Sequence, residues 1–268
     1  MMVNEILLLL GSGVIVGIIN TLGGGGSIIT MSLFQAMGMP IEVANITNRV
    51  PVVMQNFSAT VSFMRKRSVD FRNGFLLSIP AILGTIAGTV VALQVDEMTF
   101  KICLSVVLAI ILLYLILDKD NNEETSREGH ALVLKWWHYL LFFLVGFYGG
   151  YIYIGLGFLI LAVAIWTMNL DIITANVLKG CVIFISTPFA IVTVFALNHF
   201  GEGSSIDIVW NAGLLHGAGN ILGSVVASHW AMSWGVKFVK WFTLFVIVVA
   251  FVDLMGWISL QGMLSGML

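Results

Sequence analysis

Apolar stretches of about 20 residues recur along nearly the whole sequence, and this recurrence restricts the possible fold most strongly. At 1.5 Å per residue, a helix of this length crosses a hydrocarbon core of about 30 Å. A membrane barrel would instead show segments of about ten residues with alternating polarity. Only 10% of the residues are charged and the mean hydropathy is +1.02, whereas about 25% are charged in soluble domains. The sequence therefore predicts an all-α integral membrane protein, multi-pass, in the cell inner membrane or plasma membrane.

Two motifs occur twice, in the same order. "GTIAGTVVA" at 84–92 returns as "GNILGSVVA" at 219–227, and "IEVAN" at 41–45 returns as "IITAN" at 172–176. Between the copies lies "DKDNNEETSREGH" at 118–130, the longest hydrophilic stretch of the chain. We therefore predict a first transmembrane repeat at 1–117, a hydrophilic cytoplasmic linker at 118–135 and a second transmembrane repeat at 136–268.

Each half is expected to contain a helix pair broken at glycines, followed by three longer transmembrane helices. The expected segments of the first half are 4–22, 26–38, 41–64, 71–93 and 98–117. Those of the second half are 138–156, 157–169, 172–196, 206–228 and 235–256.

The distribution of cations predicts that the two halves are inverted relative to each other. Arg65, Lys66, Arg67 and Arg72 flank one loop, whereas the matching loop at 198–207 holds no Lys or Arg. Cationic loops stay on the cytoplasmic side, so these equivalent loops are expected on opposite sides. Inversion requires an odd number of crossings per half. Five crossings satisfy this, and so do three crossings plus a re-entrant pair of half-helices.

The glycine breaks are candidates for a substrate-binding site. Broken helices in inverted-repeat transporters expose backbone N–H groups near the bilayer midplane. The alternative for any of these glycines is close helix packing, which we favour for Gly84, Gly88, Gly219 and Gly223. The residues expected to line the substrate are Gly24, Gly25, Gly26, Ser27, Gly155 and Gly157.

Arg49 and Lys179 lie within apolar segments, four and three residues after the repeated Asn45 and Asn176. A charge inside a membrane helix is costly and marks a candidate functional site, and a guanidinium suits an oxyanion. We predict that Arg49 and Lys179 bind an anion, with Asn45, Asn48 and Asn176 as further donors. The alternatives are that the cations snorkel to an interface or pair with a carboxylate: Glu42, Asp171 or Asp253.

His216 lies just before the second repeated glycine motif and is a candidate for proton coupling. Hydrogen bonding between helices is the alternative explanation. Cys103 and Cys181 lie in apolar segments without CxxC spacing, so no metal site is predicted. No cofactor, catalytic residue, nucleic-acid partner or oligomeric state is predicted. The expected partners are the lipid bilayer, a small anionic substrate and a coupling ion, either a proton or sodium.

The sequence resembles the TauE/SafE sulfite exporter family. The resemblance rests on the duplicated order of a glycine-rich break, an apolar segment, "GMPIEVAN", a basic loop, "SVDF" and a GxxxG helix, and it covers nearly the whole chain. The sequence departs from the family pattern at Met31, where a proline is usual, and in the reduced second glycine cluster at Gly155 and Gly157. The resemblance implies movement of small sulfur-containing anions such as sulfite, sulfoacetate or other organosulfonates, often as export.

The sequence therefore predicts a secondary membrane transporter for small sulfur-containing anions, a probable exporter working by alternating access. The alternative functions are an anion channel and a permease for a different small organic anion. The sequence contains neither HExxH nor GxSxG, so an intramembrane enzyme is not expected.

Overall fold

The computed structural model describes residues 3–64, 71–92, 134–200, 206–254 and 262–263, and the regular structure in these ranges is helical, without strands. The helices of the first half are α1 (Val3–Leu22), α2 (Ser27–Ala36), α3 (Ile41–Met64) and α4 (Phe71–Ala92). Those of the second half are α6 (Trp136–Tyr151), α7 (Leu156–Met168), α8 (Ile172–Phe200) and α9 (Trp210–Leu254). The predicted helix at 98–117, most of the linker and the cations at 65–67 lie outside the described residues.

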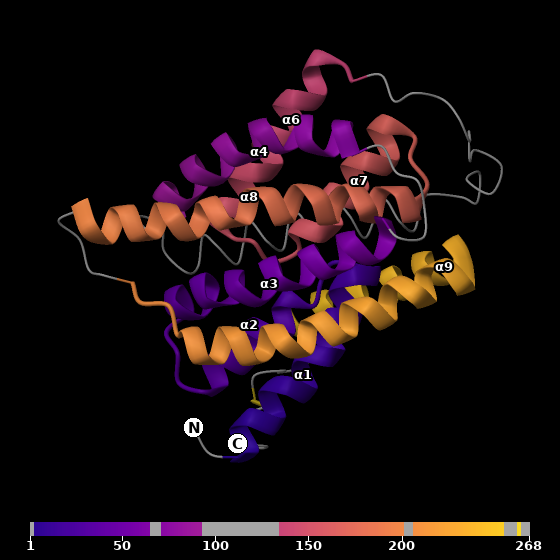
Figure 1. The fold of residues 1–268 in the computed structure, drawn as a ribbon. Helices are drawn as coiled ribbons and strands as arrows, with labels where there is room; N and C mark the ends of the chain where they lie inside the picture. The colour runs from indigo at the N-terminus through magenta and orange to yellow at the C-terminus, as the bar shows by residue number, and fades with distance from the viewer. Residues whose placement is uncertain (1–2, 65–70, 93–133, 201–205, 255–261, 264–268) are drawn as a thin grey trace.

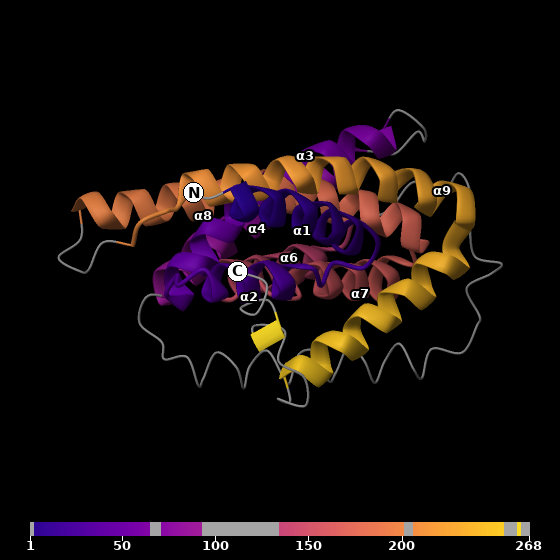
Figure 2. The ribbon, with the colours of Figure 1, turned by 90° about the horizontal axis from the view of Figure 1, so that it is seen from below.

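Helix ends fall close to the predicted positions, except at the C-terminal end of the chain. The predicted helices at 206–228 and 235–256 are joined in α9, which runs continuously from Trp210 to Leu254. Residues 229–234 contain neither glycine nor proline, so nothing local ends the helix between the two apolar segments. Figure 2 shows that α9 instead turns sharply along its length.

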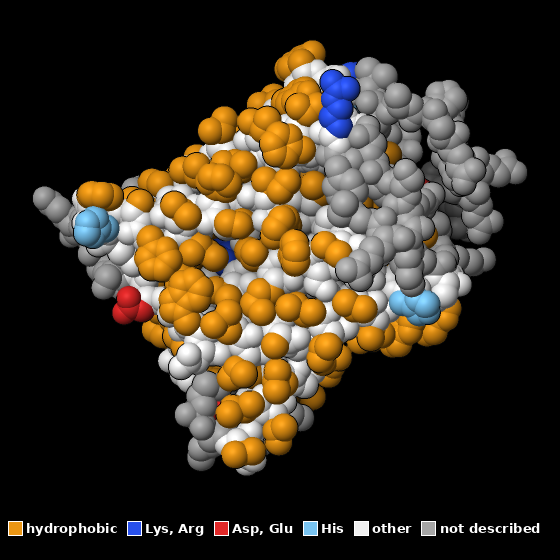
Figure 3. Space-filling model, viewed as in Figure 1, with side chains coloured by type: hydrophobic (Ala, Val, Ile, Leu, Met, Phe, Trp, Pro, Cys, Tyr) orange, Lys and Arg blue, Asp and Glu red, His pale blue; other side chains and the backbone are white. Residues whose placement is uncertain are grey.

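The described helices suit a lipid environment. Three are long and apolar enough to span a membrane, namely Val3–Leu22, Arg72–Ala92 and Ile173–Phe200. Apolar side chains cover much of the face in Figure 3, while Arg49, Gln55 and Lys179 are almost fully buried. An apolar exterior around a polar interior is the distribution expected of a membrane protein. The prediction of an all-α membrane protein is confirmed.

The most extensive helix contacts join the two halves of the chain. α1 packs along α9, and α6 packs along α4, so the first helix of each half lies on a late helix of the other half. α3 and α8 pack against each other. In addition, α3 packs against α9 and α8 packs against α4. Figure 1 shows α3 and α8 running across the middle of the molecule. The two halves are therefore interleaved rather than separate units.

Glycines spaced four residues apart form the two close helix contacts. A Cβ on Gly219 or Gly223 would come within 2.3 and 2.1 Å of α1 carbonyl oxygens. A Cβ on Gly84 or Gly88 would come within 2.0 Å of α6 carbonyl oxygens. Because a backbone oxygen cannot move aside as a side chain can, these positions require glycine. The interpretation of these four glycines as packing residues is confirmed.

Candidate functional site

The two glycine-containing breaks meet inside the protein. α1 ends at Leu22 and α2 begins at Ser27, with Gly24 at a φ of +101° between them. α6 ends at Tyr151 and α7 begins at Leu156, after Gly155 at a φ of +75°. Such φ values favour glycine and turn each chain out of its helix.

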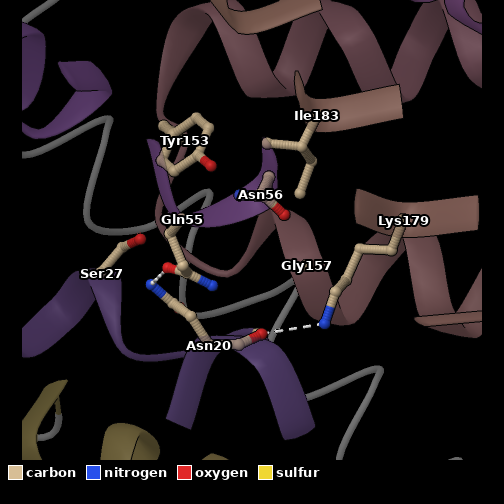
Figure 4. Close-up of a pocket in the computed structure, with 9 residues that line it drawn as sticks. Asn20, Ser27, Gln55, Asn56, Tyr153, Gly157, Lys179 and Ile183 are labelled. Atoms are coloured by element: carbon tan, nitrogen blue, oxygen red, sulfur yellow. Dashed lines mark hydrogen bonds between the residues drawn. The ribbon is translucent and has the colours of Figure 1, made fainter. Parts of the chain in front are cut away.

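A cavity lies where these breaks meet. The centre of a water molecule can occupy a volume of about 10 Å³ within it. This is room for about one water. Figure 4 shows side chains from several helices converging on it. The cavity is lined by Asn20, Gly24, Ser27, Gln55, Asn56, Tyr153, Gly157, Lys179 and Ile183. Among the described residues, the lining contains amide groups, hydroxyl groups and one cation, and it contains no carboxylate.

A chain of amide groups fixes one wall of the cavity. Asn20 Nδ2 donates to Gln55 Oε1 at 3.1 Å, and Gln55 Nε2 donates to Thr21 Oγ1 at 3.2 Å. Asn56 Nδ2 donates to the carbonyl oxygen of Val52 at 2.9 Å. These bonds connect α3 to the last turn of α1 and orient both Gln55 and Asn56.

Lys179 reaches from α8 to the end of α1. Its Nζ donates to the carbonyl oxygens of Asn20 and Thr21 at 2.9 and 3.1 Å, and to Asn176 Oδ1 at 2.5 Å. Figure 4 shows the bond to Asn20. Asn176 Nδ2 donates to the carbonyl oxygen of Leu22 at 3.4 Å, which orients the amide oxygen toward Lys179. Lys179 therefore caps the negative, C-terminal end of α1.

Arg49 makes the corresponding contact with the other broken helix. Its two terminal nitrogens donate to the carbonyl oxygens of Gly149 and Gly150, at 2.5 and 3.0 Å, in the last turn of α6. Its Cζ lies 4.5 Å from the centre of the Tyr153 ring, a cation–π contact. Arg49 does not line the cavity, whereas Tyr153, whose ring it contacts, does.

The partners of both cations are carbonyl oxygens and amides rather than carboxylates. Among the described residues, neither Arg49 nor Lys179 forms an ion pair. Asp171 is instead used at the start of α8, where its Oδ1 accepts from the backbone N–H groups of Ile173 and Thr174 at 3.0 and 3.1 Å. Glu42 is exposed, and the side chain of Asp253 lies outside the described part.

His216 connects three helices away from the cavity. Its Nδ1 lies 3.1 Å from the carbonyl oxygen of Leu9, and its Nε2 lies 3.0 Å from Thr30 Oγ1. The Leu9 oxygen can only accept, so Nδ1 carries a proton and donates it. The interhelical hydrogen bonding that was the alternative explanation for His216 is present.

Comparison with known proteins identifies the family. The family model described as Sulfite exporter TauE/SafE matches residues 9–254, which is most of the chain. The chain belongs to the TauE/SafE family.

Curated relatives of this TauE/SafE protein carry transporter names. A "Probable membrane transporter protein" of Haemophilus influenzae is 27% identical over 85% of this chain and 86% of its own length. The "Probable membrane transporter protein ORF9" of a Sinorhizobium species is 29% identical, over 84% and 83%. "Probable membrane transporter protein YfcA" of Escherichia coli K12 is 25% identical, over 84% and 80%. No solved structure matches the chain. The family is thus one of membrane transporters and not of enzymes.

Four of the substrate-binding residues predicted for this TauE/SafE protein line the cavity: Gly24, Ser27, Gly157 and Lys179. The others adjoin it or lie further away. Gly26 adjoins the lining, because a Cβ on it would lie 3.1 Å from the Asn20 side chain. Asn176 accepts a hydrogen bond from Lys179. Asn48 is buried, and neither of its side-chain polar atoms has a hydrogen-bond partner among the described residues; the same holds for Oδ1 of Asn45. Gly25 and Gly155 belong to the breaks without lining the cavity.

The predicted site omitted Asn20, Gln55, Asn56 and Tyr153. Asn20 stands in the last turn of an apolar helix directly before the glycine cluster, a position where a polar side chain is itself a signal. Gln55 and Asn56 follow Arg49 by about two helical turns. Tyr153 gives no such signal, because its position depends on a positive φ of 67° within the second break.

Proposed function

We propose that this protein is a secondary transporter that exports small sulfur-containing anions, such as sulfite, sulfoacetate or other organosulfonates, across the cell inner membrane or plasma membrane. The observation that carries the proposal is the position of Lys179. Within the described part of the chain, Lys179 is a buried cation without a carboxylate partner, and it lines a cavity of amide and hydroxyl groups at the point where two broken helices meet. An oxyanion would supply the missing negative charge and accept hydrogen bonds from the amide donors.

We also propose that the halves form an inverted repeat and move by alternating access. Reciprocal relationships support this: α1 packs on α9 as α6 packs on α4, and each buried cation caps the broken helix of the opposite half. The cavity holds about one water, so a sulfur oxyanion needs a rearrangement to bind. A channel needs a continuous aqueous path, and a site with room for about one water therefore favours the transporter over the channel.

Introducing a negative charge into the cavity tests the proposal. Gln55→Glu places a carboxylate in the lining that also holds Lys179. We expect it to abolish sulfite binding by purified protein in calorimetry, with sulfoacetate, taurine and a plain carboxylate tested alongside. Gln35→Glu makes the same change at the end of α2, outside the cavity, and should leave binding unchanged. Equal binding by wild type and Gln55→Glu would show that the anion binds outside this cavity.

Transport against a gradient distinguishes a secondary transporter from a channel. In proteoliposomes, a secondary transporter driven by an ion gradient accumulates sulfite above its external concentration, whereas a channel only equilibrates it. Preference for the carboxylate over every sulfur anion would instead support a permease for a different organic anion.

A further inference from the structure

The helices α1 and α6, which end at the two breaks, each have a cation at the C-terminal end. In each case this cation is a side chain of the protein. Lys179 binds the carbonyl oxygens of Asn20 and Thr21 on α1, and Arg49 binds those of Gly149 and Gly150 on α6. In many secondary transporters, the C-terminal ends of broken helices and unwound carbonyls coordinate the mobile coupling ion, such as Na⁺. Here these carbonyl oxygens already have partners.

The hydrogen bonds of Lys179 require the ammonium form. The carbonyl oxygens of Asn20 and Thr21 only accept hydrogen bonds, and the Asn176 amide presents its oxygen because its nitrogen donates to Leu22. Three accepting oxygens need three N–H donors, which an ammonium has and a neutral amine lacks. The positive charge of Lys179 is therefore required for this set of three hydrogen bonds.

We infer that the Lys179 ammonium takes the place of a mobile coupling cation, and that the oxygens of Asn20, Thr21 and Asn176 form a latent site for a small monovalent cation. The inference has one consequence that rests on the proposed transport function, namely that anion binding and transport do not require Na⁺. The latent site itself follows from the hydrogen bonds alone.

Removing the side chain beyond Cβ tests the latent site without any substrate. Lys179→Ala takes away the ammonium and three methylene groups and leaves the three oxygens facing the space. We expect ethylammonium chloride to raise the Tm of the purified variant in detergent, with an effect that saturates with concentration. Tetramethylammonium chloride carries the same charge without an N–H group and should give no such shift.

Lys179→Met is the matched control, because it fills the space with an uncharged chain of similar length. Neither Lys179→Met nor wild type should respond to ethylammonium beyond the response to tetramethylammonium. If Lys179→Ala is unstable, the yield of monodisperse protein purified in ethylammonium rather than tetramethylammonium becomes the measurement. Equal behaviour of Lys179→Ala in the two salts would overturn the latent site, whether or not wild type binds sulfite.

The consequence for coupling is tested on wild type. Replacing NaCl by choline chloride at constant ionic strength should leave sulfite affinity and transport unchanged. A loss of tenfold or more would show a required Na⁺ and overturn the inference. A failure to bind sulfite in either salt would count against the proposed function, and the response of Lys179→Ala would still decide the cation site.

Discussion

Gly24 and Gly157 lie in direct backbone contact, although 133 residues of sequence separate their positions: a Cβ on Gly157 would come within 2.6 Å of the Gly24 Cα. One belongs to the break of the first half and the other to the first turn of α7 in the second half. A side chain at either position would push the two breaks apart. The cavity that both residues line would change with them.

We expect Gly157→Ala to lower the stability of the folded protein by about 1–3 kcal/mol, the usual cost of overpacking. Gly157 has no positive φ, so the effect would come from contact alone. Two controls separate the causes. Gly38→Ala has a φ of +88° with nothing within 4 Å and tests backbone strain, whereas Gly11→Ala has open space in a helix. A Tm for Gly157→Ala equal to that of Gly11→Ala would contradict the contact.

The glycine contacts between α4 and α6 and between α1 and α9 predict a matched pair of effects. Gly88→Ala and Gly223→Ala each drive a methyl group against a carbonyl oxygen, at 2.0 and 2.1 Å. We expect similar decreases in Tm for the two variants in a thermal unfolding assay, since the contacts correspond. A wild-type Tm for either one would show that its helix pair shifts without cost.

Arg49 is expected to stabilise the end of α6 rather than to hold the anion in the described conformation. Arg49→Gln removes two hydrogen bonds from a charged group, each with a contribution of about 1.5–3 kcal/mol, so a marked decrease in Tm is expected. Arg49→Lys should recover only part of it, because an ammonium cannot form the two-pronged contact. Loss of sulfite binding in a folded Arg49→Gln protein would instead make Arg49 a ligand.

Proton coupling through His216 gives a separate prediction. If a second proton enters the ring, Nε2 becomes a donor, and the hydroxyl of Thr30 must turn from donating to accepting. We expect the pH dependence of transport to be lost in His216→Gln. Thr30→Val should alter the pH profile while leaving sulfite binding intact. A wild-type profile in His216→Gln would exclude this histidine as the proton carrier.

The helices and their breaks could be predicted because their signals are local. Hydropathy gives the lengths of α1 and α4, and four consecutive glycines end α1 at Leu22. The partners of Arg49 and Lys179 could not be predicted, since a backbone carbonyl has no sequence signature. Of the carboxylates considered as partners, Glu42 is exposed and Asp171 caps its own helix. The continuity of α9 was also missed, because two separate helices were predicted at 206–228 and 235–256, although the helix propensity of residues 229–234 allows one continuous helix.

The pairing of α1 with α9 also sets an order for events during synthesis. About 190 residues separate Leu22 from Trp210, and at 5–20 residues per second the ribosome needs roughly 10–40 s to make them. During that interval α1 lies in the bilayer with Gly13 and Gly17 facing lipid or a temporary neighbour, because the helix that covers them has not been made. A chain that stops before Trp210 would leave this helix without its partner and its glycine face uncovered.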